Sequence, residues 1–138
     1  MVWMITLEEK YCYAILDGRK KIEVRTRKPK ALSAGDAVLV CMKGTHGRVP
    51  FYFTIDAISA CSPQIIWKFY KHQMAIDEAD YRAYTKGKAI VYGLSIRQVY
   101  QYVPALTIDD FGVYKAPQWF TVVPCAKTPL IVGSGKGD

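Results

Sequence analysis

The sequence has only two histidines, no closely spaced cysteine pair, no long apolar run and fewer acidic than basic residues. Four irregularly spaced cysteines with so few histidines argue against a zinc site or a disulfide framework, so we expect free thiols, no metal and no cofactor. No apolar segment approaches the ~20 residues that a transmembrane helix needs. The first residues lead into Glu8 and Glu9 rather than into a signal-peptide core, so we expect a cytoplasmic protein that does not contact membranes.

The rest of the composition is that of one globular domain. The chain has 138 residues, 51% of them hydrophobic, and it shows no internal repeat or dividing linker. That length is sufficient for a hydrophobic core. The last residues, 133–138, are too rich in glycine to pack. We therefore expect a domain over residues 1–124 and a tail over residues 125–138 that is partly disordered.

Residue patterns predict the secondary structure. We expect Thr6 and Glu9 to form a capping box for the first helix, Gly18 to end that helix and Gly93 to form a bulge in a long strand. The loop 43–50 is rich in glycine but lacks a Walker pattern, which argues against a P-loop. The predicted strands are Val2–Leu7, Lys20–Arg27, Val38–Met42, Phe51–Ile58, Ala89–Val103 and Trp119–Val123. The predicted helices are Glu8–Asp17, one that begins at Ser62-Pro63, one from Asp77 to Gly87, and a single turn at Thr107–Phe111.

One short segment concentrates the positive charge of the chain. The twelve residues Gly18–Pro29 hold six cations and one acid, Glu23, and the whole chain has a formal net charge of +7. Such a segment favours a polyanionic partner, although a net charge can also serve solubility alone. Strand alternation predicts that Ile22 and Val24 pack inward. The polar face then carries Lys21, Glu23, Arg25 and Arg27.

The spacing G-x-K-x-x-E-x-R followed by G-D-x-V resembles the ASCH family, a branch of the PUA-like superfamily associated with RNA and modified nucleobases. The matching positions are Gly18, Lys20, Glu23, Arg25, Gly35 and Asp36. The resemblance extends more loosely over residues 3–123. It implies an α+β fold, namely a PUA-like mixed β-barrel of about five to six strands with about two to three flanking helices.

The family resemblance also implies a site at Lys20, Glu23 and Arg25. The Glu23 carboxylate would hold Lys20 and Arg25 in fixed positions, and Arg25 has the planar fork that reads a phosphate or a base edge. An exposed network of ion pairs is the alternative. Strict alternation places Lys20 on the other face from Glu23, but we expect the turn after Gly18 to bring Lys20 toward the acid. Lys21, Arg27 and Lys28 would extend the ligand-binding surface.

A second reading is a small hydrolase without a cofactor. Bacterial amidohydrolases that act on N4-acetylcytidine are similar over this motif, and their lysine falls on Lys20, whereas their threonine nucleophile falls on Glu23. Their glutamate maps near His72, which is able to act as a general base near neutral pH, or simply to lie at a helix end. Other relatives of the fold cut RNA, and Lys20, Lys21, Arg25 and His72 are the residues that would support a ribonuclease.

Aromatic residues are abundant, with ten Tyr, three Trp and five Phe. Most must form the core, but a base-binding pocket would stack a base on one or two of them. We expect Trp67 and Tyr70 near the mouth of the barrel, and Tyr114, Gln118 and Trp119 at the ligand, with Gln118 reading a base edge.

These observations favour a module that binds RNA, single-stranded nucleic acid or a modified nucleoside in a basic cleft. The hydrolase is the second hypothesis. A third is an interaction adaptor that uses the basic face for an acidic protein partner. The sequence does not indicate the oligomeric state.

Overall fold

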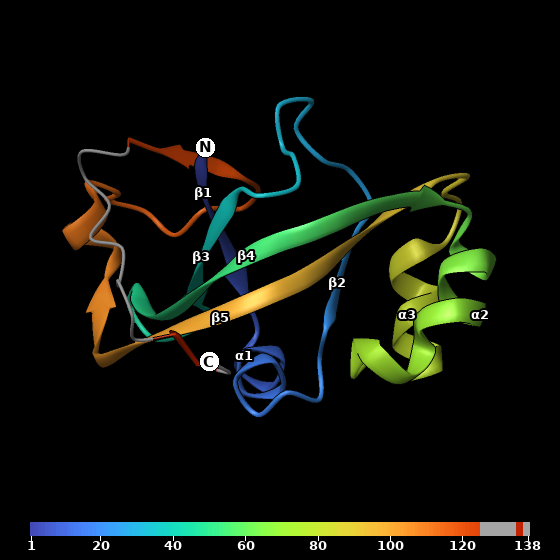
Figure 1. Cartoon of the computed structure of the whole chain (residues 1–138), viewed down its shortest axis with the longest axis horizontal. Helices are drawn as coiled ribbons and strands as arrows, with labels where there is room; N and C mark the ends of the chain where they lie inside the picture. The colour runs from blue at the N-terminus through green and yellow to red at the C-terminus, as the bar shows by residue number, and fades with distance from the viewer. Residues whose placement is uncertain (125–134, 137–138) are drawn as a thin grey trace.

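The computed structural model describes residues 1–124 and 135–136 (Figure 1). It is a mixed α+β fold in which one sheet carries three helices and a short 3-10 turn. The strands are β1 (Val2–Leu7), β2 (Ile22–Arg25), β3 (Ala37–Met42), β4 (Arg48–Cys61), β5 (Val91–Thr107), β6 (Thr121–Val123) and β7 (Gly135–Lys136). The helices are α1 (Glu9–Leu16), α2 (Pro63–Met74), α3 (Glu78–Thr85) and η1 (Ile108–Phe111).

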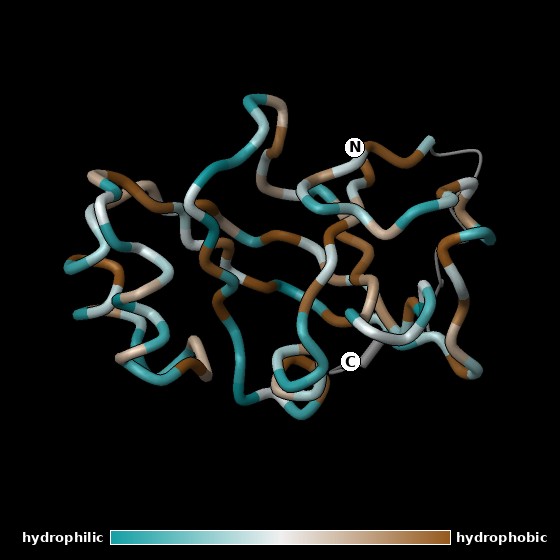
Figure 2. Tube along the Cα trace, turned by 180° about the vertical axis from the view of Figure 1, so that it is seen from behind, coloured by the Kyte–Doolittle hydropathy of each residue, from teal (hydrophilic) through white to brown (hydrophobic). Residues whose placement is uncertain are grey.

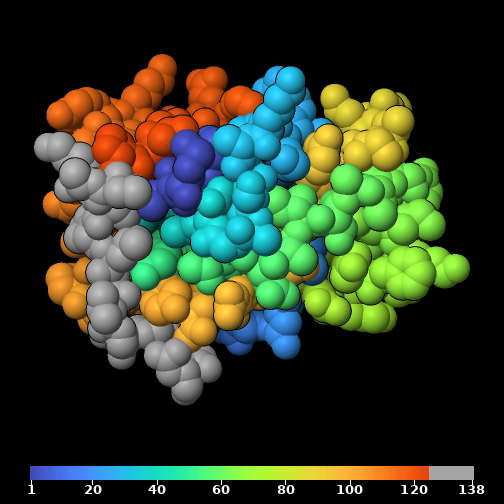
Figure 3. Space-filling view, turned by 45° about the horizontal axis from the view of Figure 1, so that its top comes forward, coloured from blue at the N-terminus to red at the C-terminus, as the bar shows by residue number. Residues whose placement is uncertain are grey.

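The sheet is built around two long neighbouring strands, β4 and β5. Its order is β2-β5-β4-β3-β1-β6, and β7 pairs separately with β5. The β1–β3 pair is parallel, whereas the other pairs are antiparallel. Strands β4 and β5 cross the molecule and separate α2 and α3 at one end from η1 and β6 at the other (Figures 1 and 3).

The expected barrel is not closed by hydrogen bonds between its terminal strands. Within residues 1–124 and 135–136, β2 pairs only with β5 and β6 only with β1. Side chains approach across this opening instead: the Arg25 guanidinium lies 5.3 Å from the centroid of the Phe120 ring, and that of Arg27 lies 4.9 Å from the centroid of Trp119.

Apolar residues cover both faces of the sheet. Alternation along β1 puts Trp3 and Ile5 in the core beneath α1, and Met4 in a second cluster that includes Phe111 of η1. Every residue of β3 is buried, which explains its continuous apolar sequence. A third cluster, which includes Ile66 and Tyr81, joins α2 and α3 to β2 and β5. Hydrophobic segments accordingly follow the strands through the middle of the molecule (Figure 2).

Two local predictions are wrong and two are confirmed. The hydroxyl of Thr6 donates to the Pro117 carbonyl at 2.7 Å instead of capping α1, whose N-cap residue has no side-chain cap. Gly93 pairs regularly with its neighbours, and the register shifts in the long pair lie near residues 49–51 and 54–57. As expected, Gly18 follows α1 with a φ of 86°, and the Ser62 hydroxyl caps α2.

The predicted tail lies largely outside the described residues. Its two described residues, 135–136, pair with β5 as β7. Of the cysteines, Cys12 and Cys41 are buried free thiols and Cys61 is half-buried, while Cys125 lies outside the described residues. Burial raises the pKa of the Cys12 thiol to about 12. None of the helices in the described part of the chain has the length and apolar character needed to span a membrane.

Candidate functional site

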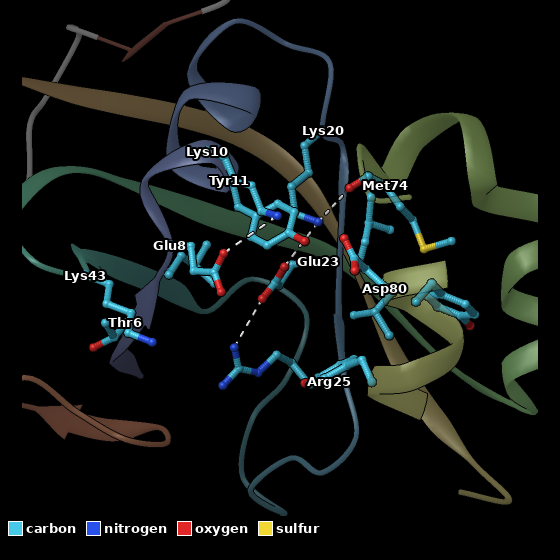
Figure 4. Close-up of a pocket in the computed structure, with 15 residues that line it drawn as sticks. Thr6, Glu8, Lys10, Tyr11, Lys20, Glu23, Arg25, Lys43, Met74 and Asp80 are labelled. Carbon is cyan, nitrogen blue, oxygen red and sulfur yellow. Dashed lines mark hydrogen bonds and ion pairs between the residues drawn. The ribbon is translucent and has the colours of Figure 1, made fainter. Parts of the chain in front are cut away.

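A cavity of about 430 Å³, here called the central cavity, lies between α1, β2 and α3 (Figure 4). The ends of β1 and α2 complete its walls. The charged and aromatic side chains around it are Glu8, Lys10, Tyr11, Lys20, Glu23, Arg25, Lys43, Asp80, Tyr81 and Tyr84.

Local geometry explains how Lys20 enters this cavity. After the positive φ of Gly18, the chain turns back, and the Lys20 N–H donates to the Ala14 carbonyl of α1 at 2.9 Å. Strand β2 begins only at Ile22, so Lys20 does not follow the alternation of the strand. The expected break in alternation is therefore confirmed, and Lys20 and Glu23 meet although their positions differ in parity.

The Lys20 ammonium is buried and has three partners. Its Nζ donates to the Met74 carbonyl at 2.8 Å, lies 3.3 Å from Glu23 Oε1 and sits 5.1 Å from the centroid of the Tyr11 ring. Lys20 is only 4% exposed. Met74 is the last residue of α2, whose carbonyl end carries partial negative charge and favours a cation. Because a buried charge without partners is costly, these contacts hold the amine in one place.

Glu23 joins the two cations of the site. Its Oε1 faces Lys20, its Oε2 accepts a hydrogen bond from Arg25 Nη1 at 3.2 Å, and the residue is only 6% exposed. Figure 4 shows Lys20, Glu23 and Arg25 in a row along the wall that β2 forms. The carboxylate therefore fixes both cations relative to each other.

Tyr11 forms the aromatic wall above the Lys20 amine. Burial raises the pKa of its phenol, and the nearby Lys10 ammonium opposes that effect only in part. The phenol is therefore neutral at physiological pH and remains a hydrogen-bond donor.

A smaller cavity of about 230 Å³, the side cavity, adjoins the first one. It shares Arg25 and Tyr84 with the central cavity. Its other lining residues are Thr26, Arg27, Gln118 and Trp119. Three residues predicted at the ligand, Arg27, Gln118 and Trp119, thus meet here rather than beside Lys20.

Lys21 and His72 lie in a different place. Together with Arg19 and Lys71 they line an open depression of about 600 Å³, here called the basic hollow. Lys21 was expected beside Glu23, but it precedes β2 and is exposed. Its N–H donates to the Gln73 carbonyl at the end of α2, and its carbonyl accepts from the Ile96 N–H of β5, so the backbone of Lys21 joins the end of α2 to the sheet.

Four more predicted residues lie away from the central cavity. The Lys28 ammonium donates to the carbonyls of Pro29 and Leu32 and so stabilises the loop after β2. Tyr114 is 86% exposed and lines neither cavity nor the basic hollow. Trp67 packs on Tyr81 at 4.9 Å between ring centroids, and Tyr70 joins the same cluster.

Sequence reasoning missed Tyr11, Lys43 and Tyr84. In the sequence, Tyr11 looked like an ordinary residue of an amphipathic helix. The turn at Gly18 was nevertheless a sign that Lys20 folds back onto that helix, where it meets Tyr11. Lys43 lies in the turn directly after β3 and Tyr84 lies in α3, and no local pattern relates either residue to β2. Their place in the cavity depends on the tertiary fold.

The second part of the sequence motif, Gly35 and Asp36, stabilises the fold and does not line the central cavity. Asp36 accepts hydrogen bonds from the Trp3 indole, the Ser33 N–H and the Met1 amine, each at 2.9 Å. Burial alone would raise the pKa of Asp36, but the bonds from Met1, Trp3 and Ser33 outweigh it and lower that pKa. These contacts join the start of β1 to the start of β3. Asp36 therefore stabilises the sheet rather than the cavity.

Comparison with known proteins relates the chain to one family. The model of the ASCH domain matches residues 5–124. The crystal structure of ASCH from Zymomonas mobilis is 19% identical, covers 91% of this chain and 90% of that one, and has a TM-score of 0.79. A tyrosine-to-phenylalanine mutant of that protein is 20% identical, with 91% and 92% coverage and the same TM-score.

A third structure, of a hypothetical protein, is 20% identical, covers 70% of this chain and 98% of that one, and has a TM-score of 0.53. At these identities the structural likeness shows the fold alone. No curated protein matches the chain at a significant level. The family match, which spans most of the sequence, shows that the chain belongs to the ASCH domain family.

Proposed function

We propose that this ASCH domain binds RNA or a modified nucleobase in the central cavity. The observation that carries the proposal is the row formed by buried Lys20, buried Glu23 and half-buried Arg25, which lines a cavity of about 430 Å³. That volume is within the range of about 300–1,000 Å³ that small-molecule sites occupy. The fixed cations supply hydrogen-bond donors for base carbonyl or phosphate oxygens, and Tyr11 supplies an aromatic wall.

The open side of the sheet also supports the proposal. Within the described part of the chain, strands β2 and β6 do not pair, and in the region where Arg25 lies against Phe120 and Arg27 against Trp119 the side cavity gives a strand of RNA a place to approach. Partners would then be RNA, single-stranded nucleic acid or a modified nucleoside. The cytoplasmic location expected from the sequence stays a prediction.

A hydrolase acting on a nucleoside amide is the second candidate, because Lys20 and Glu23 lie 3.3 Å apart in the same cavity. Both oxygens of Glu23 already contact cations, which favours an orienting role over that of a base acting on water. A ribonuclease that depends on His72 has less support, since His72 lines the basic hollow and not the central cavity.

One experiment separates these functions. The purified protein is titrated with cytidine, N4-acetylcytidine and labelled single-stranded RNA, while binding and turnover are both recorded. We expect saturable binding without turnover, and an RNA affinity whose logarithm falls linearly with the logarithm of the salt concentration. Turnover of N4-acetylcytidine would establish the hydrolase instead. Binding to none of the three probes would refute the proposed function and leave the adaptor.

A further inference from the structure

We infer that the side cavity binds the nucleotide next to the one held in the central cavity, so that the ligand is a single-stranded oligonucleotide rather than a free nucleoside. This inference rests on the function proposed above and specifies its ligand. It follows from the contact between the two cavities, from the surfaces in the side cavity and from the position of its charges.

The two cavities are adjacent and differ in volume. Arg25 and Tyr84 line both of them, so the two cavities lie side by side and one ligand of two linked units is able to contact both. The side cavity, at about 230 Å³, has roughly half the volume of the central one. A site of that size beside a nucleoside-sized cavity suits one additional flat ring.

The side cavity presents two planar groups for stacking. The Arg27 guanidinium lies 4.9 Å from the centroid of the Trp119 ring, and Trp119 is 38% exposed. Phe120 supports the indole edge-to-face at 5.9 Å. Aromatic rings and guanidinium planes are the surfaces on which proteins stack unpaired bases. The adjacent Gln118 amide offers both donors and acceptors to a base edge.

The side cavity has basic but no acidic side chains among its described lining residues, and Arg25 lies between it and the central cavity. This distribution of charge suits a phosphate that links two nucleotides. The central cavity has three acids among its cations, Glu8, Glu23 and Asp80, whereas none of the six described residues that line the side cavity is acidic. Arg25 lies at the junction, with its guanidinium fixed by Glu23. The phosphodiester that connects two adjacent nucleotides must pass this junction, and a fixed guanidinium is well suited to bind it.

The test compares ligands of increasing length on the full chain. The probes are a mononucleoside, its monophosphate and dinucleotides extended on either side, with cytidine and N4-acetylcytidine as the first base, and affinities are measured by calorimetry. We expect a dinucleotide extended on one side to bind about tenfold or more tightly than the monophosphate, as stacking of one base supports. We also expect that ratio to fall to about one in Trp119→Leu, which retains apolar cover on Phe120 but has no ring.

Matched variants control for folding and charge. Phe69→Leu removes an aromatic ring that is 65% exposed and lines neither cavity, and it should leave the ratio as in the parent protein. Arg27→Ala should lower the ratio, whereas Arg97→Ala, which removes the same charge from another exposed position, should not. Trp119→Phe should restore much of the ratio that Trp119→Leu loses.

The outcomes separate the inference from the function on which it rests. Binding of the mononucleoside with no gain for any dinucleotide would overturn the second nucleotide site and leave the proposed function intact. A gain that neither Trp119→Leu nor Arg27→Ala reduces would also overturn it. If mononucleoside and dinucleotides all fail to bind, the proposed function itself is wrong.

Discussion

Two adjacent lysines lie in opposite environments. Lys20 is buried in the central cavity with a carboxylate, a carbonyl and an aromatic ring, whereas Lys21 is exposed in the basic hollow beside Lys71 and His72. The two differ by one position in the sequence and carry the same charge. What distinguishes a candidate site from a solvated surface is therefore burial together with a paired acid, and not the density of charge along the chain.

The comparison of Lys20 with Lys21 predicts its largest effect in the free energy of unfolding. Lys20→Met should lower the free energy of unfolding by about 3 kcal/mol, because Glu23 loses one of its two cations in a buried site. The Met74 carbonyl loses its hydrogen bond as well. Lys21→Met should change stability by no more than about 0.5 kcal/mol, as an exposed substitution does. Urea denaturation of both variants measures the difference, and equal values would contradict the distinction.

Asp36 sharpens the comparison, because it is a buried acid outside the cavity. Its hydrogen bonds lower its pKa in the folded state, so the unfolded chain binds more protons at acidic pH. The contribution to stability is present above the unfolded pKa of about 3.9 and is lost as the pH falls through the lower folded value. Asp36→Asn should destabilise by about 1–3 kcal/mol at neutral pH without weakening ligand binding.

Urea denaturation of Asp36→Asn and the parent protein at several pH values tests this point. The difference between them should shrink as the pH falls below about 4. A difference that persists at the lowest pH would mean that the charge of Asp36 contributes little. If Asp36→Asn lost as much ligand affinity as Lys20→Met, Asp36 would belong to the ligand site. The assignment of Asp36 to the sheet and of Lys20 to the central cavity would then be wrong.

Glu23→Gln should have a smaller effect than Lys20→Met, and it separates a ligand-binding module from an enzyme. If Glu23 orients Lys20 and Arg25, the amide keeps part of the hydrogen bonding, and ligand binding should weaken by only about 1–2 kcal/mol or even strengthen for a polyanion. If Glu23 is a general base, binding should persist while turnover falls by about 10²–10⁴-fold. Glu9→Gln, at an exposed position of α1, is the control. We expect the first outcome.

The sequence predicted the elements of the fold better than the walls of the site. Strand alternation and glycine punctuation located most strands and helices, and the family motif indicated that Lys20, Glu23 and Arg25 belong together. Lys21 was assigned to the wrong surface because alternation was applied before the strand begins. The Tyr84 wall and the opening between β2 and β6 depend on how distant elements pack, which no local pattern encodes.

The most direct test of the central claim compares the binding of labelled single-stranded RNA to Lys20→Met and Lys21→Met by fluorescence anisotropy. Both variants are measured below their unfolding midpoints. If the central cavity binds the ligand, Lys20→Met should lose about tenfold or more in affinity through a buried charged hydrogen bond. Lys21→Met should change the RNA affinity by less than about threefold, and this difference from the parent protein should become smaller as the salt concentration rises. An equal or greater loss in Lys21→Met would show that the exposed basic surface, and not the central cavity, binds RNA.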